Sequence, residues 1–202
     1  MSIFKYFREK LFIESSSVFS IAKKNKTPFY LYSERQIKEN YSNFAKVFKN
    51  ISPLICFAAK ANTNLTIMRI LGKLGSGADV VSGGELLRAL KAGINPNKIV
   101  FSGVGKTEEE LKLAIRKKIL LINVESESEA ILINKIGKKI NKVISIGFRI
   151  NPNVDAKTHK KISTGKAENK FGLSIKSFSS FYKNIKNYKN LKIDAISVHI
   201  GS

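Results

Sequence analysis

Short apolar runs rich in β-branched residues alternate along the chain with longer segments in which apolar residues recur every three or four positions. The short runs predict strands, and the longer amphipathic segments predict helices. The predicted strands cover residues 29–32, 54–58, 78–81, 99–101, 119–124, 143–150 and 193–198. The helical spacings are those of Ile37, Tyr41, Phe44 and Val47, of Leu65, Met68 and Leu71, of Leu86, Leu87 and Leu90, of Leu111, Ala114 and Ile115, and of Ile175, Phe178 and Tyr182.

The regular alternation of strands and helices indicates the fold class. From Lys60 to Ile150 the successive strand ends are about 20 to 26 residues apart, the length of one strand–helix unit. Such units form parallel sheets, and one helix per strand at a near-constant spacing favours a (β/α)8 barrel over an open doubly wound sheet. The expected fold is therefore α/β, an incomplete barrel with about six of the eight strands.

Four of the predicted helices begin with a capping box, in which a hydroxyl residue is followed three positions later by Glu or Gln. The pairs are Ser33 and Gln36, Ser82 and Glu85, Thr107 and Glu110, and Ser126 and Glu129. The third box overlaps Gly103-Val-Gly-Lys-Thr107, which is similar to the end of a P-loop. Because Val100 stands where that motif needs glycine, we interpret this segment as a helix entry.

One connection is longer than the others. Residues 151–172 are polar and turn-forming and contain no apolar run. A loop of that length inside a compact domain is usually functional or mobile.

Composition and charge narrow the functional classes. The chain has 202 residues, with 36 Lys and Arg against 15 Asp and Glu, and a formal charge of +21. Lysines are spread along the whole sequence without a nucleic-acid recognition motif, so we expect a solvated basic surface and no nucleic-acid partner. The single cysteine, Cys56, excludes a disulfide framework and a multi-cysteine zinc site and is expected in the core of a strand. With no apolar stretch of about 18 residues and no signal-peptide core, the sequence predicts a cytoplasmic protein without a membrane contact or a bound metal.

Polar residues at the ends of the predicted strands are the candidates for chemistry, because these ends line the active-site mouth of a parallel barrel. They are Lys60, Asp79, Ser102, Arg149, His199 and Ser202. A partly buried lysine amine is a competent Schiff-base nucleophile, although a lysine in this position is as often an ordinary solvent-exposed residue. Asp79 and Arg149 lie in apolar strands and each needs a polar or charged partner.

Five motifs occur in a fixed order. They are Phe57-Ala-Ala-Lys-Ala-Asn62, Gly77-Ala-Asp-Val-Val-Ser-Gly-Gly-Glu-Leu86, Phe148-Arg-Ile-Asn-Pro152, the run from His159 to Gly172, and His199-Ile-Gly-Ser202. With this order and spacing, the sequence from about residue 27 closely resembles the diaminopimelate decarboxylases. These are pyridoxal-phosphate enzymes of the alanine-racemase-like barrel class, which convert meso-2,6-diaminopimelate to L-lysine and CO₂.

The resemblance assigns a role to each candidate residue. Lys60 would form the Schiff base with pyridoxal phosphate, and His199 would stack on the pyridine ring; these two are the expected catalytic residues. The other expected cofactor-binding residues are Asp79, Glu85, Arg149 and Ser202. For two of these residues a structural role is the alternative. Glu85 is equally expected to cap a helix as the third residue of a capping box, and His199 could be a hydrogen-bonded histidine of the core.

The resemblance also implies what lies outside this chain. Family members have two more barrel strands and a β-domain, which carry the glycine-rich phosphate loop, the acidic partner of the pyridine nitrogen and a cysteine that crosses a homodimer interface. We therefore expect residues 1–33 to pair with that β-domain, residues 34–202 to form a partial cofactor-binding barrel, and the chain alone to be weak or inactive. The alternatives are a single-domain protein of pyridoxal-phosphate homeostasis and another basic amino-acid decarboxylase of the same fold.

Overall fold

The computed structural model describes residues 3–154 and 171–201. Its main sheet is parallel throughout, with the strand order β10-β8-β7-β6-β5-β4. These strands are β4 (Cys56–Ala58), β5 (Gly77–Val80), β6 (Ile99–Phe101), β7 (Leu121–Val124), β8 (Ile144–Asn151) and β10 (Leu191–Ser197), and β9 (Leu173–Ser174) adds a short pairing to β8. Neighbouring barrel strands are consecutive in the chain, as the predicted incomplete barrel of six strands requires.

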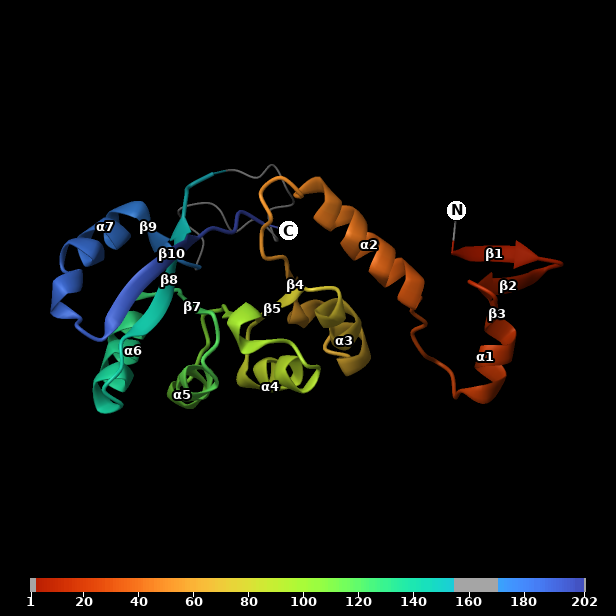
Figure 1. The fold of residues 1–202 in the computed structure, drawn as a ribbon, viewed down its shortest axis with the longest axis horizontal. Helices are drawn as coiled ribbons and strands as arrows, with labels where there is room; N and C mark the ends of the chain where they lie inside the picture. Colours follow the sequence, from red (N-terminus) through yellow and green to blue (C-terminus); the bar gives the residue numbers. More distant parts are fainter. Residues whose placement is uncertain (1–2, 155–170, 202) are drawn as a thin grey trace.

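Helices follow the strands in turn. They are α2 (Glu34–Val47) ahead of the sheet, then α3 (Leu65–Lys73), α4 (Gly83–Lys91), α5 (Glu108–Lys117), α6 (Glu127–Lys139) and α7 (Ile175–Lys183). Figure 1 shows α3, α4, α5 and α6 side by side in chain order along one side of the sheet. Each strand and the helix behind it thus form one repeating unit of the arc.

All four predicted helix starts are confirmed, but the glutamates differ in what they bind. Ser33, Ser82, Thr107 and Ser126 each accept a hydrogen bond from the backbone N–H three residues later. Only Thr107 and Glu110 close a complete capping box. Glu85 and Glu129 instead accept the N–H of the residue before the N-cap, so their carboxylates hold the strand-to-helix loop as well as the helix end.

The core lies between the sheet and its helices. Its largest fully buried side chains include Phe101, Phe148, Met68 and Leu86. Phe148 of β8 contacts Phe178 and Phe181 of α7, with ring centroids 5.4 and 5.1 Å apart, respectively. This aromatic contact fastens the last helix to the sheet.

One glycine is required by close packing between strands. A Cβ on Gly77 of β5 would lie 2.2 Å from the carbonyl oxygen of Lys98 and 2.7 Å from Cys56 Sγ. Any larger residue would therefore push β5 away from its neighbours, which explains the glycine that begins this strand.

The predicted strand at 29–32 is wrong. These residues form neither a helix nor a strand, and Tyr30 is 90% exposed. A strand is stabilised by pairing with a neighbour, and the pairings found among the described residues include none for this segment. Apolar composition alone therefore misidentified it.

The sequence pattern also missed a small sheet at the N-terminus. Strands β1 (Phe4–Phe7), β2 (Lys10–Ile13) and β3 (Ser16–Ser17) form an antiparallel sheet that α1 (Val18–Lys24) follows. Figure 1 shows this unit beyond the far end of α2 from the sheet. Glu14 accepts hydrogen bonds from the Ser33 hydroxyl and the Arg35 N–H, and the Ser33 bond lowers the pKa of Glu14. This carboxylate ties the unit to the start of α2.

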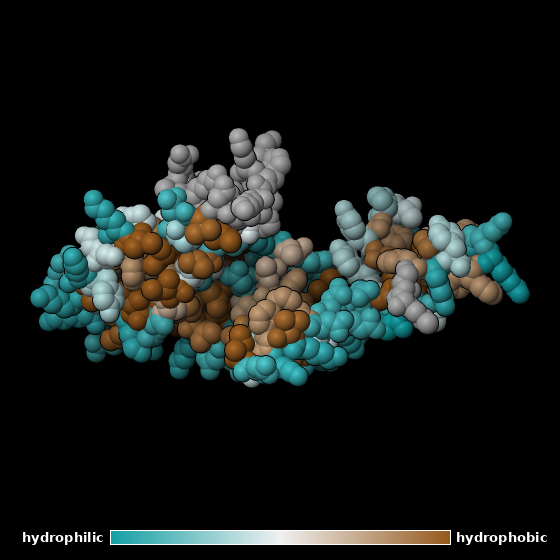
Figure 2. Space-filling model, turned by 90° about the horizontal axis from the view of Figure 1, so that it is seen from above, coloured by the Kyte–Doolittle hydropathy of each residue, from teal (hydrophilic) through white to brown (hydrophobic). Residues whose placement is uncertain are grey.

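Hydrophobic side chains are exposed where the main sheet ends. Seen from above, Figure 2 shows a broad hydrophobic area bordered by hydrophilic side chains, on the side of the molecule away from α4 and α5. Exposed apolar residues include Leu54 next to β4 and Ile196 and Val198 at β10, the two outermost strands. Unpaired strand edges with apolar side chains favour association with other chains.

Removing the core aromatic contact is expected to destabilise the protein strongly. Phe148→Ala deletes a fully buried ring and should lower the free energy of unfolding by about 3–5 kcal/mol. Phe44→Ala, at a position 53% exposed, is the matched control and should cost about 1 kcal/mol or less. Urea unfolding followed by circular dichroism measures both; equal losses would contradict this description of the core.

Candidate active site

A cavity of about 1000 Å³ opens at the carboxyl ends of the parallel strands. Five of the six polar residues that end the predicted strands line it: Lys60, Asp79, Ser102, Arg149 and His199. The other lining residues are Leu54, Cys56, Val81, Val100, Gly103, Val104, Asn123, Glu125, Phe171, Ser197 and Val198. The carboxyl-end rule for parallel barrels thus gathered residues from β4 to β10 around one space.

Lys60 follows β4 directly, in the single 3-10 turn Ala59–Ala61. Ala59 is fully buried and anchors the turn, whereas Lys60 is exposed at the cavity. The partial burial expected for a nucleophilic lysine is therefore not found. The amine is instead accessible to a molecule that enters the cavity.

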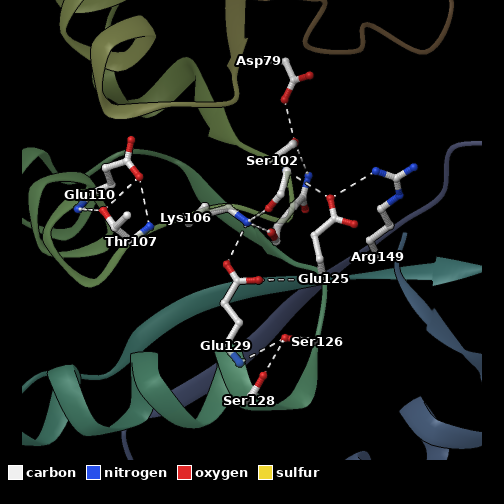
Figure 3. Close-up of polar contacts among 12 residues, drawn as sticks. Asp79, Ser102, Lys106, Thr107, Glu110, Glu125, Ser126, Ser128, Glu129 and Arg149 are labelled. Atoms are coloured by element: carbon white, nitrogen blue, oxygen red, sulfur yellow. Dashed lines mark hydrogen bonds and ion pairs between the residues drawn. The ribbon is translucent and has the colours of Figure 1, made fainter. Parts of the chain in front are cut away.

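Asp79 belongs to a chain of hydrogen bonds across three strand ends. Ser102 Oγ donates to Asp79 Oδ1 at 2.6 Å, and Asn123 Nδ2 donates to Ser102 Oγ at 3.2 Å. Asp79 thus has the polar partner that its strand position requires, although that partner is a hydroxyl and not a cation. These hydrogen bonds fix the Asp79 carboxylate on the cavity wall (Figure 3).

Arg149 has the anionic partner that its apolar strand predicts. Its Nη1 lies 3.1 Å from Oε1 of Glu125, and the two side chains are only 15% and 2% exposed. The same oxygen accepts the N–H of Gly103 at 3.1 Å. The guanidinium carbon also lies 5.0 Å from the ring centroid of Phe171, within the range of a cation–π contact.

His199 lies two residues beyond β10 and is exposed, so the alternative of a buried core histidine is wrong. Its Nδ1 accepts the backbone N–H of Gly201 at 3.2 Å, which places the proton of the neutral ring on Nε2. Partial burial lowers the pKa of His199, and the positive charges of Arg149 and Lys60 lower it further, while Asp79 acts in the opposite direction. The ring is therefore held neutral among charged groups.

A buried lysine fixes the loops behind these residues. The Lys106 side chain is fully buried, and its Nζ donates to the carbonyls of Gly103 and Asn123 at 2.6 and 2.7 Å. It also forms an ion pair with Glu129 at 2.8 Å (Figure 3). All of its donors are used inside the protein, which agrees with the interpretation of this segment as a helix entry and not a phosphate loop.

Two predicted cofactor residues are not placed at the cavity. Glu85 accepts the N–H of Val81 at 2.8 Å and serves α4, and it is not among the lining residues of the described chain. Ser202 and the motif residues from His159 to Asn169 lie outside the described residues. Cys56 is half-buried and not a full core residue, and burial raises the pKa of its thiol to about 11, which keeps it protonated.

Comparison with known families decides the class. Residues 34–202 match the pyridoxal-binding domain of the pyridoxal-dependent decarboxylases. The chain belongs to this family. Its cofactor is pyridoxal phosphate, as the motif resemblance implied.

Curated relatives are diaminopimelate decarboxylases. The enzyme of Aquifex aeolicus is 47% identical over 193 residues, which are 96% of this chain and 46% of the relative. That of Haemophilus influenzae is 44% identical over 202 residues, 100% of this chain and 49% of the relative. The chain thus spans about half the length of the curated relatives it matches.

Solved structures share the incomplete barrel. Diaminopimelate decarboxylase from M. jannaschii in co-complex with L-lysine matches with a TM-score of 0.91 at 41% identity, over 98% of this chain and 48% of that one. The enzyme from Helicobacter pylori complexed with L-lysine matches with a TM-score of 0.87 at 47% identity, over 91% of this chain and 47% of that one. An arginine decarboxylase of Paramecium bursaria Chlorella virus has a TM-score of 0.75 at 20% identity and shows the same fold alone.

The residues that line the cavity fit pyridoxal phosphate. A primary amine, a guanidinium and a neutral imidazole line one cavity, and these groups suit an aldehyde, an anionic oxygen and an aromatic ring, respectively. The volume is at the upper end of the range for ligand sites. Among the described residues no group of three potential metal ligands occurs, and no helix is long and apolar enough to cross a membrane.

Glu125 and Asn123 were missed in the sequence. Both lie at the end of β7, whose last apolar residue, Val124, marks the predicted strand end at 124. Glu125 is the first polar residue after that run and stands directly before the helix cap Ser126. The strand-end rule therefore contained the signal for Glu125.

Loss of the buried lysine is expected to destabilise the protein. Lys106→Met leaves the Glu129 carboxylate without its ion pair and should lower the free energy of unfolding by about 3–5 kcal/mol. The control is Lys112→Met, whose exposed ion pairs with Glu108 and Glu109 should matter little. Urea unfolding compares the two; a stability of the Lys106 variant equal to that of the control would contradict the role of the buried pair.

The environment of His199 predicts its titration. Because its pKa is lowered, the Cε1 proton resonance should titrate with a midpoint below 6.5, and Arg149→Gln should move that midpoint upward. Between the folded pKa and 6.5 the unfolded chain binds more protons, so His199 contributes a loss of stability as the pH falls through this range. His199→Gln identifies the resonance and Arg116→Gln is the control. A midpoint at or above 6.5 in the unmodified protein would overturn this assignment.

Proposed function

We propose that this chain forms the cofactor-binding partial barrel of a diaminopimelate decarboxylase, which converts meso-2,6-diaminopimelate to L-lysine and CO₂. The observation that carries the proposal is the convergence of Lys60, Arg149 and His199 on one cavity of a partial barrel that is 41–47% identical to enzymes of that name. The substrate is a small amino acid, in keeping with the relatives that hold L-lysine. A homodimer, a cytoplasmic location and pairing of residues 1–33 with a β-domain stay predictions of the same proposal.

Four of the residues that line the cavity have a task in this proposal. Lys60 offers an accessible amine as the attachment point for the aldehyde of pyridoxal phosphate. His199 offers the face of a neutral ring, since its pKa is lowered, and Arg149 offers a donor to an anionic oxygen. Asp79, held by Ser102, supplies a negative charge beside these cations. When bound, the cofactor supplies the electron sink that decarboxylation needs.

Covalent trapping tests the cofactor half of the proposal. The purified chain is incubated with pyridoxal phosphate, reduced with borohydride and mapped by mass spectrometry; we expect one modified peptide, carrying the adduct on Lys60. Lys60→Ala should lose the adduct, and Lys91→Ala, which removes an exposed lysine at the end of α4, should keep it. Labelling scattered over many lysines at equal yield would speak against a built site.

A CO₂-release assay tests the decarboxylase half. We expect the chain with pyridoxal phosphate to release CO₂ from meso-2,6-diaminopimelate in preference to L-arginine or L-ornithine, weakly if at all when alone and more strongly with the carboxyl-terminal half of a relative added. Preference for arginine or ornithine would assign another basic amino-acid decarboxylase. Cofactor binding with no release in either condition would leave only a pyridoxal-phosphate-binding protein.

A further inference from the structure

Arg149 faces the cavity from β8, where a long cationic side chain could take several orientations. We propose that Glu125 is the positioning residue that fixes its guanidinium, an inference that rests on the proposed function of the cavity. Glu125 need not touch the cofactor or the substrate in this role. It acts through Arg149.

The Glu125 carboxylate is almost completely buried, so it requires a positively charged partner at a fixed place. Its side chain is 2% exposed, and Oε1 lies 3.1 Å from both Arg149 Nη1 and the Gly103 nitrogen. A buried carboxylate is costly without a countercharge. Arg149 is the cation placed to supply that charge, so the two side chains constrain each other.

The carboxylate rests on a fixed base. The backbone N–H of Glu125 donates to Glu129 Oε2 at 2.9 Å, while the other oxygen of Glu129 binds the fully buried Lys106. Lys106 also holds the carbonyl of Gly103, whose N–H binds Glu125. Figure 3 shows this continuous series from Lys106 through Glu129 and Glu125 to Arg149. The Gly103 nitrogen binds the Glu125 carboxylate, and the Glu129 carboxylate binds the Glu125 backbone. Both of these groups are fixed through Lys106.

The second oxygen of Glu125 makes Glu125→Gln the substitution closest in shape. Oε2 is buried and has no hydrogen-bond partner among the described residues. In Glu125→Gln the amide oxygen can keep both existing contacts while the amide nitrogen occupies the site of Oε2. The substitution therefore removes the charge and preserves the shape and the two hydrogen bonds, while its amide N–H groups occupy a site with no acceptor among the described residues, a cost that the urea midpoint measures separately.

Nuclear magnetic resonance observes the positioning directly. We expect a slowly exchanging, sharp Nη1–H resonance for Arg149, since this nitrogen donates to Glu125, and the resonance is identified by its disappearance in Arg149→Lys. Glu125→Gln should broaden or average this resonance, whereas Glu127→Gln, an exposed residue of the same segment, should leave it unchanged. Matching circular dichroism and urea midpoints establish that both variants fold. An unchanged Arg149 resonance in a folded Glu125→Gln protein would overturn the inference.

Affinity for pyridoxal phosphate, measured by equilibrium dialysis, tests the consequence. Glu125→Gln should weaken binding about fivefold, the difference between a charged and a neutral hydrogen bond, and Arg149→Gln more strongly. The double variant should bind as Arg149→Gln does, because Glu125 acts through Arg149. Unchanged or tighter binding by Glu125→Gln, or the same factor in both backgrounds, would refute the role. No binding by the unmodified chain would refute the proposed function instead, and leave the resonance result to decide the positioning.

Discussion

Three glutamates hold the loops at the cavity side of the sheet: Glu85, Glu110 and Glu129, in the first turns of α4, α5 and α6. Each accepts a backbone N–H that precedes its own helix or begins a neighbouring one, at 2.7–2.9 Å. Glu110 of α5 reaches Gly83 at the start of α4, and this bond is the largest cause of its lowered pKa. Glu110, whose charge also favours its own helix N-terminus, thereby connects two adjacent strand–helix units, while Glu85 and Glu129 each hold the loop of their own unit.

The charged cavity residues are held by neighbouring cavity residues on the strand ends and the braced loops. Asp79 and Arg149 approach the space from β5 and β8, and each is held by one partner that a braced strand end or loop carries, Ser102 or Glu125. The polar groups are thus placed before any ligand arrives, which is the condition for tight and selective binding of a charged molecule. The core contacts, by contrast, lie on the other side of the sheet and set its stability.

The sequence predicted the parts that are governed by local periodicity and by the carboxyl-end rule. The six barrel strands, the four caps and the gathering of Lys60 and His199 follow from these two regularities. The strand at 29–32 failed because pairing is non-local, and no pattern within the segment shows that it lacks a neighbour. Glu125 could have been found by the same rule, because it is the first polar residue after a strand, whereas the use of Glu85 in capping depends on side-chain direction, which spacing does not specify.

The places of Lys60 and His199 in the strand order have a geometric consequence. They follow β4 and β10, the two ends of a six-stranded sheet, with five pairings between them. In a flat sheet those strands would be roughly 24 Å apart, at about 4.8 Å for each pairing. Yet both residues line one cavity, and the charge of Lys60 acts on His199. The distance between the Lys60 amine and the His199 imidazole is thus set by the curvature that accumulates over all five strand pairings. A small change of twist at any one pairing therefore alters this distance.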